Sequence, residues 1–419
     1  MIQLISRWGK EIDPGNILQE YPRPNLVRDS YFNLNGEWEC RINESETADF
    51  YDETIIVPFS PESMLSGVGK IVMPHQRLHY RKKFTLPEGF KKSRVLLHFG
   101  AVDQECSVFV NGIRVGGHKG GYLPFHFDIT DSLRQGENVL TLSVTDRTEQ
   151  SPHARGKQKL QKKGKYASLF YTPQSGIWKT VWMESVEKAY IEDVRITPLY
   201  DDSSVRFEIT VLNACKTSGA ETSGGKASGG ETSGTVRLAV LERGVEIGQA
   251  EITVRQEKEI KQVISQEIKL DGFKPWTPDT PHLYDVIIRY GEDEVRSYFG
   301  MRKLSTGRDG KGILRFFLNN KPYFFNGILD QGYWPESLMT APSDEALVYD
   351  IIKLKEMGYN TIRKHVKIEA ERFYYHCDRL GMMVWQDMPN GGGEYNMVFV
   401  THLPNASDRF ARGVSDRHY

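Results

Sequence analysis

The sequence is short of cysteine, of long apolar runs and of net charge, and each shortage excludes a class of protein. Its four cysteines lie far apart without a CxxC pair, a pattern that does not indicate a disulfide framework and favours a reducing, cytoplasmic location. No apolar run is long enough to span a bilayer, and Lys10, Glu11 and Asp13 interrupt the first residues too soon for a signal peptide. With 54 basic and 55 acidic side chains, we expect neither nucleic acid nor a membrane as a partner.

The motifs of several enzyme classes are missing as well. The sequence has no P-loop, no GxGxxG, no HExxH and no GxSxG, which excludes the common signatures of phosphate, dinucleotide and zinc sites and of serine hydrolases. The glycine-rich residues 116–121 and 391–393 lack phosphate-binding spacing and are interpreted as a turn and a loop. We therefore expect no cofactor and no metal.

What the sequence does have is a long series of short strands. Residues 94–99 and 106–110 are apolar runs of strand length, and Asn111 with Gly112 after the second is typical of a tight hairpin turn. Residues 138–144 alternate polar and apolar, which is typical of a strand with one solvated face. Short strands separated by turns favour a β-sandwich, which we expect over residues 1–185.

A second all-β region follows in residues 186–304. Three runs, at 205–211, 236–240 and 283–288, fit the strands of a smaller sandwich of immunoglobulin type. Between the first two lies a segment built almost wholly from Ser, Gly, Thr, Ala, Lys and Glu, a composition that cannot form a core. We expect a flexible loop over residues 216–234.

Helices enter after about residue 305. Ser343 suits an N-cap, with acids following in the first turn. The pattern predicts a helix that ends at Gly358, a strand at 359–362, a second helix that ends at Gly381 and a strand at 382–385.

With an opening strand near residues 323–327, this order is β-α-β-α-β, the start of a parallel α/β unit for which a (β/α)₈ barrel is one candidate. A barrel needs about eight strands, whereas we can place three before Tyr419, and residues 391–419 are polar and irregular. We therefore expect residues 305–419 to form an incomplete α/β (TIM-type) barrel in a truncated chain.

Polar residues follow each of the three parallel strands at its carboxyl end, where α/β barrels bind their ligands. They are Asp330 and Gln331 after the first strand, Arg363, Lys364 and His365 after the second, and Gln386 and Asp387 after the third. Acids, a guanidinium and an imidazole near tryptophans suit a polyhydroxylated ligand, so we expect a carbohydrate partner. An internal ion-pair network is the alternative for Arg363 with Asp387, and for His365 a structural role is the preferred interpretation.

Short motifs in a shared order carry a resemblance to a known family. They are residues 32–38 (FNLNGEW), 57–59 (VPF), 79–84 (HYRKKF), 97–103 (LHFGAVD), 110–112 (VNG), 176–182 (GIWKTVW), 299–302 (FGMR) and 357–363 (MGYNTIR). Together they resemble glycoside hydrolase family 2, which holds β-galactosidases, β-glucuronidases and β-mannosidases. The resemblance covers nearly the whole chain and implies an all-β jelly-roll sugar-binding domain, an immunoglobulin-like domain and a (β/α)₈ catalytic barrel.

The resemblance also implies a retaining mechanism, in which a glutamate acid/base and a glutamate nucleophile stand about 5 Å apart. In the family the acid/base belongs to an Asn-Glu pair after the fourth barrel strand, and the nucleophile follows the seventh. The sequence has no Asn-Glu pair beyond the start of the predicted barrel. We expect both catalytic residues to lie beyond Tyr419 and this chain alone to be inactive.

The resemblance implies a role for two further residues. Asp146 matches the position from which the jelly roll of related enzymes reaches toward the sugar, and the loop after it, through His153, Arg155 and Lys157, is long and basic enough to extend there. A solvated loop is the alternative. Arg363 matches the family's arginine at the end of the second strand, which supports the active-site carboxylates.

Two departures from the family pattern limit this assignment. Where the family has Ser-His-Tyr-Pro, this chain has residues 364–367 (KHVK), an offset that argues against His365 as a sugar ligand. Residues 385–389 (WQDMP) lack the acid and the histidine that bind magnesium in some β-galactosidases, so no metal is expected there.

The sequence thus predicts a retaining exo-β-glycosidase for terminal β-galactosides or β-glucuronides, present here without its catalytic glutamates. The alternative is a non-catalytic carbohydrate-binding protein in which the jelly roll alone supplies the function. The β-α-β-α-β start separates the two, because a pure binding module has no use for it. Many members of the family assemble, so a homo-oligomer is a further expectation.

Overall fold

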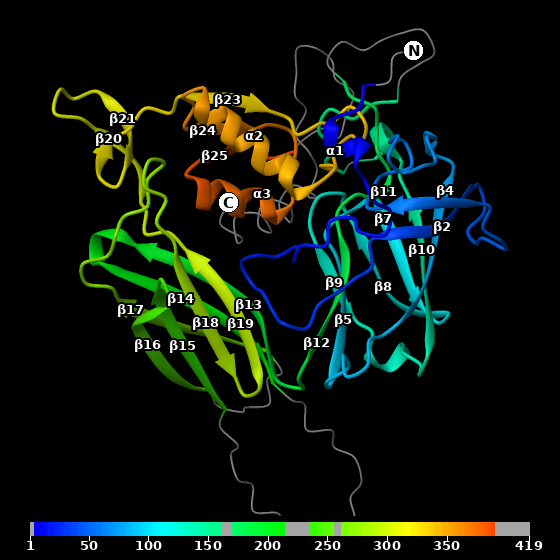
Figure 1. The fold of residues 1–419 in the computed structure, drawn as a ribbon, viewed down its shortest axis with the longest axis horizontal. Helices are drawn as coiled ribbons and strands as arrows, with labels where there is room; N and C mark the ends of the chain where they lie inside the picture. Colours follow the sequence, from blue (N-terminus) through cyan, green and yellow to red (C-terminus); the bar gives the residue numbers. More distant parts are fainter. Residues whose placement is uncertain (1–3, 152, 161–169, 214–233, 255–260, 390–419) are drawn as a thin grey trace, which may run out of the picture.

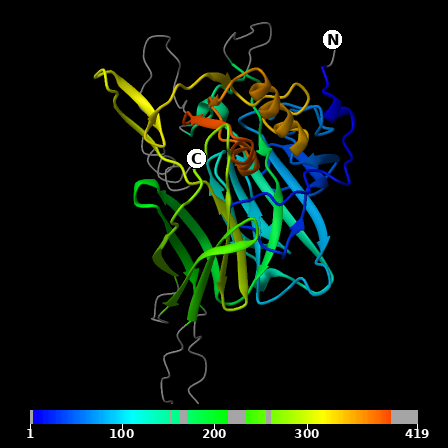
Figure 2. The ribbon, with the colours of Figure 1, turned by 60° about the vertical axis from the view of Figure 1, so that its left-hand side comes forward.

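The computed structural model describes residues 4–151, 153–160, 170–213, 234–254 and 261–389. Figure 1 shows two β-sandwiches side by side, with a smaller α/β part across one end of both, and Figure 2 gives the same arrangement from another side. The predicted loop at 216–234 and the predicted irregular segment at 391–419 lie outside the described residues, apart from Gly234, which begins a strand.

The first sandwich contains a six-stranded and a four-stranded antiparallel sheet. The larger sheet has the order β3 (Glu53–Val57), β2 (Gly36–Asn43), β4 (Arg77–Thr85), β10 (Glu137–Thr145), β7 (Glu105–Val110) and β8 (Ile113–Lys119). The smaller has the order β1 (Phe32–Asn33), β12 (Val181–Val186), β5 (Arg94–Phe99) and β9 (Phe125–Asp128). A separate pair joins β6 (Val102–Asp103) and β11 (Gly176–Ile177), and the short helices are α1 (Arg7–Lys10), η1 (Thr130–Ser132) and η2 (Thr148–Gln150).

The alternation in β10 determines which of its side chains enter the core. Leu140, Leu142 and Val144 are buried in the core of the sandwich, and the residues between them face outward. The β7–β8 hairpin turns at Asn111 and Gly112 with φ of 52° and 80°, the left-handed conformation that this dipeptide tolerates. The strand and turn predictions for this region are therefore confirmed.

The second sandwich is smaller and immunoglobulin-like. One sheet contains β13 (Tyr190–Leu199), β14 (Ser204–Leu212) and β17 (Lys261–Lys269), and the other has the order β16 (Val245–Val254), β15 (Gly234–Glu242), β18 (Tyr284–Tyr290) and β19 (Asp293–Phe299). The 3₁₀ turn η3 (Tyr200–Asp202) connects β13 to β14. Buried Val, Ile and Phe side chains from both sheets form one core.

The α/β part begins with an antiparallel sheet that the sequence did not predict. It contains β20 (Leu304–Arg308), β21 (Leu314–Leu318) and β22 (Lys321–Pro322), and it projects from the body in Figure 1. Three parallel strands follow, β23 (Gly327–Asp330), β24 (Thr361–Lys364) and β25 (Met383–Gln386), connected by α2 (Asp344–Glu356) and α3 (Glu371–Leu380).

The predicted order of this part is confirmed, but the strand positions were wrong by one to four residues. The opening strand is β23 rather than residues 323–327, because Tyr323 and Phe325 pack beside the buried Trp276 and Leu318 instead of entering the parallel sheet. Both helix ends were placed correctly, since Gly358 and Gly381 adopt φ of 87° and 75° after α2 and α3.

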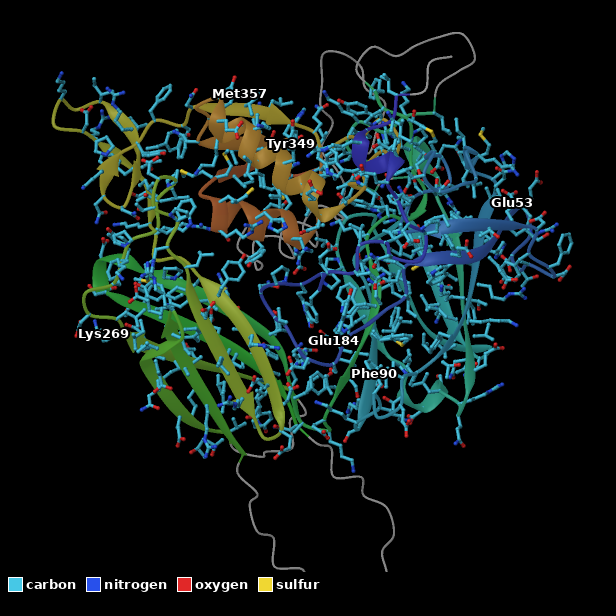
Figure 3. All side chains as sticks on the ribbon, viewed as in Figure 1. Glu53, Phe90, Glu184, Lys269, Tyr349 and Met357 are labelled. Carbon is cyan, nitrogen blue, oxygen red and sulfur yellow. The ribbon has the colours of Figure 1, made fainter. Side chains whose placement is uncertain are left out.

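Hydrogen bonds fix the α/β part to both sandwiches. Trp276 Nε1 of the second sandwich donates to the Asp378 carbonyl at 2.7 Å, and Thr340 Oγ1 donates to the Trp178 carbonyl of the first at 2.7 Å. Figure 3 places Glu184 where the two sandwiches meet. Across the described ranges, no helix has the length and apolar character needed to cross a membrane.

Candidate functional site

The candidate site lies at the carboxyl ends of β23, β24 and β25, here called the carboxyl edge (residues 330–331, 363–365 and 386–387). Parallel register aligns Leu329 with Arg363 and Trp385 across the three strands. Because side chains alternate along a strand, Ile362 packs against the helices while Arg363 points to the opposite face. Half of the Arg363 side chain (52%) is exposed there.

Arg363 and Asp387 form the predicted pair. Arg363 donates from Nε to Oδ2 of Asp387 at 2.9 Å, and its Nη2 forms an ion pair with the same oxygen at 2.7 Å. A guanidinium held in this way is oriented but keeps further N–H groups for hydroxyl or carboxylate oxygens. The pair is thus compatible with an internal ion pair and with direct ligand contact, the two interpretations that the sequence left open.

His365 lies at the same edge in a defined tautomer. Its Nδ1 accepts a hydrogen bond from Gln331 Nε2 at 2.7 Å, so a neutral ring carries its proton on Nε2. Burial, followed by the charge of Lys157, lowers the pKa of His365, and the charge of Asp387 opposes this shift only in part. Gln331 in turn accepts a hydrogen bond from the Tyr171 hydroxyl of the first sandwich. The imidazole is therefore a neutral, oriented hydrogen-bond donor.

Asp330 hydrogen-bonds to Lys364 and Gly332 rather than to Arg363. Its Oδ2 accepts from Lys364 Nζ at 2.6 Å and its Oδ1 from the Gly332 amide at 2.7 Å. Lys364 is 1% exposed and also bonds to Glu369 at 3.1 Å. Asp330, whose side chain is 32% exposed, thus pairs with a buried lysine that also contacts Glu369.

The sequence analysis missed most of the charged residues around Lys364. Lys367 is fully buried and contacts Glu369 Oε1 at 2.5 Å and the Met339 carbonyl at 2.6 Å. Burial lowers the pKa of Lys367 to about 8. Against the effect of burial, Lys364 and Lys367 lower the pKa of Glu369 to about 2. Residues 363–372 are rich in charged side chains throughout, so the sequence carried no local signal that these three would be buried together.

Two segments of the first sandwich, at residues 156–157 and at Tyr171, pack beside the carboxyl edge. The Tyr171 amide donates to the Lys157 carbonyl at 2.9 Å, and the Tyr171 ring stacks on Tyr333 at 3.9 Å between ring centroids. Gly156 lies against the Val366 backbone so closely that a Cβ atom would come within 2.6 Å of its carbonyl. Of the predicted basic loop, Lys157 is the residue whose charge acts on His365.

Asp146 occupies the base of that loop. It is 3% exposed and accepts hydrogen bonds from the Thr148 amide at 2.7 Å and from Ser175 Oγ at 2.9 Å. His153, in the same loop, turns toward Glu105 at 3.2 Å. The role of Asp146 in sugar binding stays a prediction.

Two further acids that the sequence analysis missed interact with Asp146. Burial, opposed by backbone hydrogen bonds and assisted by the charge of Asp146, raises the pKa of Glu62 to about 8. Burial and then Asp146 raise the pKa of Asp103 well above its ordinary value, and Asp103 Oδ2 accepts from Gln158 Nε2 at 3.1 Å. Within the described residues, these acids do not form a group that could hold a metal ion.

Two family models match the chain. The one described as glycosyl hydrolases family 2, sugar binding domain, matches residues 67–181. The one described as glycosyl hydrolases family 2 matches residues 189–302. The matched ranges correspond to most of the first sandwich and nearly all of the second.

Individual relatives extend the similarity into the α/β part. A β-galactosidase from Thermoanaerobacter pseudethanolicus is 30% identical over 319 residues, which cover 74% of this chain and 39% of that protein. A β-glucuronidase from Streptococcus agalactiae is 21% identical over 392 residues, covering 89% of this chain and 59% of that protein. The chain thus spans less than two thirds of the length of either curated relative.

Solved structures share the fold. A family 2 β-galacturonidase from Eisenbergiella tayi superposes with a TM-score of 0.71 at 20% identity, covering 96% of this chain and 64% of that one. A β-glucuronidase from Bifidobacterium dentium gives a TM-score of 0.66 at 23% identity, covering 87% and 62%. From the two sandwiches, the α/β order and these matches, the chain belongs to glycoside hydrolase family 2.

Proposed function

We propose that the chain is part of a retaining exo-β-glycosidase acting on terminal β-linked sugars of the galactoside or glucuronide type. In this proposal residues 1–185 form a jelly-roll sugar-binding domain, residues 186–304 an immunoglobulin-like domain and residues 305–419 the start of a (β/α)₈ catalytic barrel. The observation that carries it is the parallel sheet whose carboxyl edge gathers Arg363, Asp387 and His365.

The chemistry of the edge supports a sugar hydroxyl as ligand. The remaining N–H groups of Arg363 and the Nε2–H of His365 are donors, and the carboxylate of Asp387 is an acceptor. Asp330 acts indirectly in this proposal, because its carboxylate is engaged by buried Lys364. Asp146 remains a proposed contact that needs the loop after it to move, since it is 3% exposed.

Bond cleavage by the proposed mechanism needs two glutamates about 5 Å apart, and we assign neither role to a residue of this chain. The chain is therefore expected to bind sugar without hydrolysing a glycoside. A non-catalytic carbohydrate-binding protein is the second candidate, favoured by the match of residues 67–181 to a sugar-binding domain. The parallel strands favour the glycosidase.

The test combines turnover with binding. Incubation of the chain with nitrophenyl β-galactoside or β-glucuronide is expected to release no nitrophenol. Saturation-transfer NMR is expected to detect binding of galactose or glucuronate, weakened about tenfold by Arg363→Met, since a charge-assisted hydrogen bond contributes roughly 1.5–3 kcal/mol. The matched control is Arg237→Met, whose side chain is exposed on the second sandwich.

Two outcomes would contradict the proposal. Nitrophenol release would mean that the catalytic acids lie within this chain. Sugar binding that is unchanged by Arg363→Met would favour a binding module that acts without the carboxyl edge.

A further inference from the structure

A second polar hollow lies on the first sandwich, on the outer face of its six-stranded sheet. It is called the sheet groove here, and it has a volume of about 620 Å³, part of which is open to solvent. Arg77, Arg114, Lys119, Glu105, Ser107 and Ser143 line it. None of these residues belongs to the carboxyl edge.

The floor of the sheet groove is hollow because three small residues meet on adjacent strands. Antiparallel register places Ser143 of β10 opposite Ser107 of β7, and Ser107 opposite Gly117 of β8. Ser143 alternates with the buried Leu142 and Val144 and therefore faces outward. Its Oγ is shielded from solvent and has no hydrogen-bond partner among the described residues.

The walls of the groove carry positive charge on two sides. Arg77 of β4 is oriented by a 3.1 Å hydrogen bond to Thr145 Oγ1. Arg114 of β8 folds back over the floor, where a Cβ atom on Gly117 would lie 3.0 Å from its Nη2. Unlike Arg77, the exposed Arg114 has no ion-pair or hydrogen-bond partner within the part of the chain that the structure describes.

The local charge contrasts with that of the whole chain, whose formal net charge is −1. Three cationic side chains, Arg77, Arg114 and Lys119, line the groove with one carboxylate, Glu105, which Lys119 contacts at 3.1 Å. Outside the lining, the exposed Glu46 lies 3.4 Å from Arg77, so Arg114 is the cation without an acidic partner among the described residues. His118 adds no charge near neutral pH, because burial lowers its pKa to about 4. The groove therefore offers guanidinium groups to an anion and serine hydroxyls to neutral oxygens.

We propose that the sheet groove is a second glycan-binding site, selective for an acidic saccharide. Its carboxylate pairs with Arg77 and Arg114 and draws Arg114 off the floor, where Ser107 and the shielded Ser143 then meet the saccharide hydroxyls. Guanidinium groups recognise carboxylates through paired N–H donors. A free inorganic anion would pair with the arginines alone, whereas an acidic saccharide would also contact the serine hydroxyls of the floor. The site needs no catalytic residue and is independent of the proposed hydrolysis.

One short segment, residues 153–157, connects the sheet groove to the carboxyl edge. Glu105 of the groove contacts His153 Nε2 at 3.2 Å, and the chain continues from His153 to Lys157, whose charge acts on His365. A glycan held in the groove would thus lie on the domain that also supplies the loop beside the carboxyl edge.

Isothermal titration calorimetry with digalacturonate tests this site on the intact chain. Binding is expected to weaken about tenfold with Arg114→Met, which removes a charge-assisted contact, and to weaken with Ser143→Val, a change that an outward strand position tolerates. Arg237→Met removes an equivalent exposed charge from the second sandwich and is expected to leave binding unchanged. Circular dichroism confirms that each variant is folded.

Other ligands test the ligand class, and a comparison of two variants tests the location of the site. Lactose, which is neutral, is expected to bind at least about tenfold more weakly than digalacturonate, and sulfate is expected not to displace digalacturonate at equal concentration. Equal affinity for lactose, or displacement by sulfate, would overturn selectivity for an acidic saccharide. Binding that is lost with Arg363→Met but kept with Arg114→Met would assign the ligand to the carboxyl edge and overturn the groove site, whereas the reverse pattern supports it.

Discussion

Glu62 shows how burial sets the chemistry of a single residue. Its carboxyl group accepts hydrogen bonds from the amides of Val72 at 3.3 Å and Ser175 at 3.0 Å. These bonds favour the ionised form, yet burial outweighs them and raises its pKa from the ordinary 4.5 to about 8. The folded state consequently favours a protonated Glu62 over a pH range in which an unfolded chain would ionise it.

This shift predicts a pH dependence of stability with a defined sign. Between pH 4.5 and 8 the unfolded state has released the Glu62 proton and the folded state retains it, so the free energy of unfolding falls as pH rises, by at most about 1.4 kcal/mol per unit. Glu62→Gln is expected to flatten this decline, as measured by urea unfolding at several pH values. Glu46→Gln, at a side chain that is 88% exposed, is the control and should retain the wild-type slope. Equal slopes for all three proteins would show that Glu62 titrates normally.

At the scale of the element, α2 and α3 differ in how they begin. Ser343 Oγ accepts a hydrogen bond from the Ala346 amide at 3.1 Å at the start of α2. Ala370, the N-cap of α3, offers no side-chain acceptor. Asp344 in the first turn of α2 also binds Arg372 and His376 of α3, so the start of one helix is tied to the other.

The two N-caps therefore predict changes of opposite sign. Ser343→Ala is expected to lower the free energy of unfolding by about 1 kcal/mol, because an amide at the helix start loses its acceptor. Ala370→Ser supplies an acceptor to α3 and is expected to raise it by up to about 1 kcal/mol. Urea unfolding measures both. Should Ser343→Ala have no effect, or Ala370→Ser destabilise the protein, capping would not control these helix ends.

At the scale of the molecule, Arg28 joins the two sandwiches. It donates to both carboxylate oxygens of Asp293 in β19 at 2.9 Å and to Glu184 in β12 at 3.2 Å. Arg28 is 5% exposed, and the two acids are at most 3% exposed. Burial, then the charge of Asp293, raises the pKa of Glu184. Arg23 also donates to Glu184, at 3.1 and 3.2 Å, so Glu184 has two guanidinium partners and Arg28 is the one shared with Asp293.

Arg28→Met is expected to destabilise the protein by roughly 3–5 kcal/mol, because it leaves the buried carboxylate of Asp293 without the guanidinium that pairs with it. Since Arg28 contacts both sandwiches, differential scanning calorimetry is expected to separate their unfolding into two transitions. The double variant Arg28→Met with Asp293→Asn removes the uncompensated charge and should recover part of the loss. A single transition at the wild-type temperature would contradict this role.

Local patterns identified much of the fold because they depend on neighbours in the chain. The alternation in β10, the turn at Asn111 and Gly112, and the helix ends at Gly358 and Gly381 were all predicted from a few residues each. The opening parallel strand was misplaced, because Tyr323 and Phe325 pack on residues distant in sequence. The antiparallel sheet β20–β22 was missed as well. A cytoplasmic location and a homo-oligomer stay predictions from sequence and family.

For the candidate site, the sequence by itself determined which residues follow each parallel strand, since strand order and helix ends are encoded locally. It also carried the family motifs. Only the tertiary structure decided that Arg363 pairs with Asp387 while Asp330 turns to Lys364. It likewise decided that Tyr171 and Lys157 approach His365 and that Lys367 and Glu369 are buried together. These outcomes depend on contacts between residues far apart in the chain, and burial by distant segments is what sets their charges and partners.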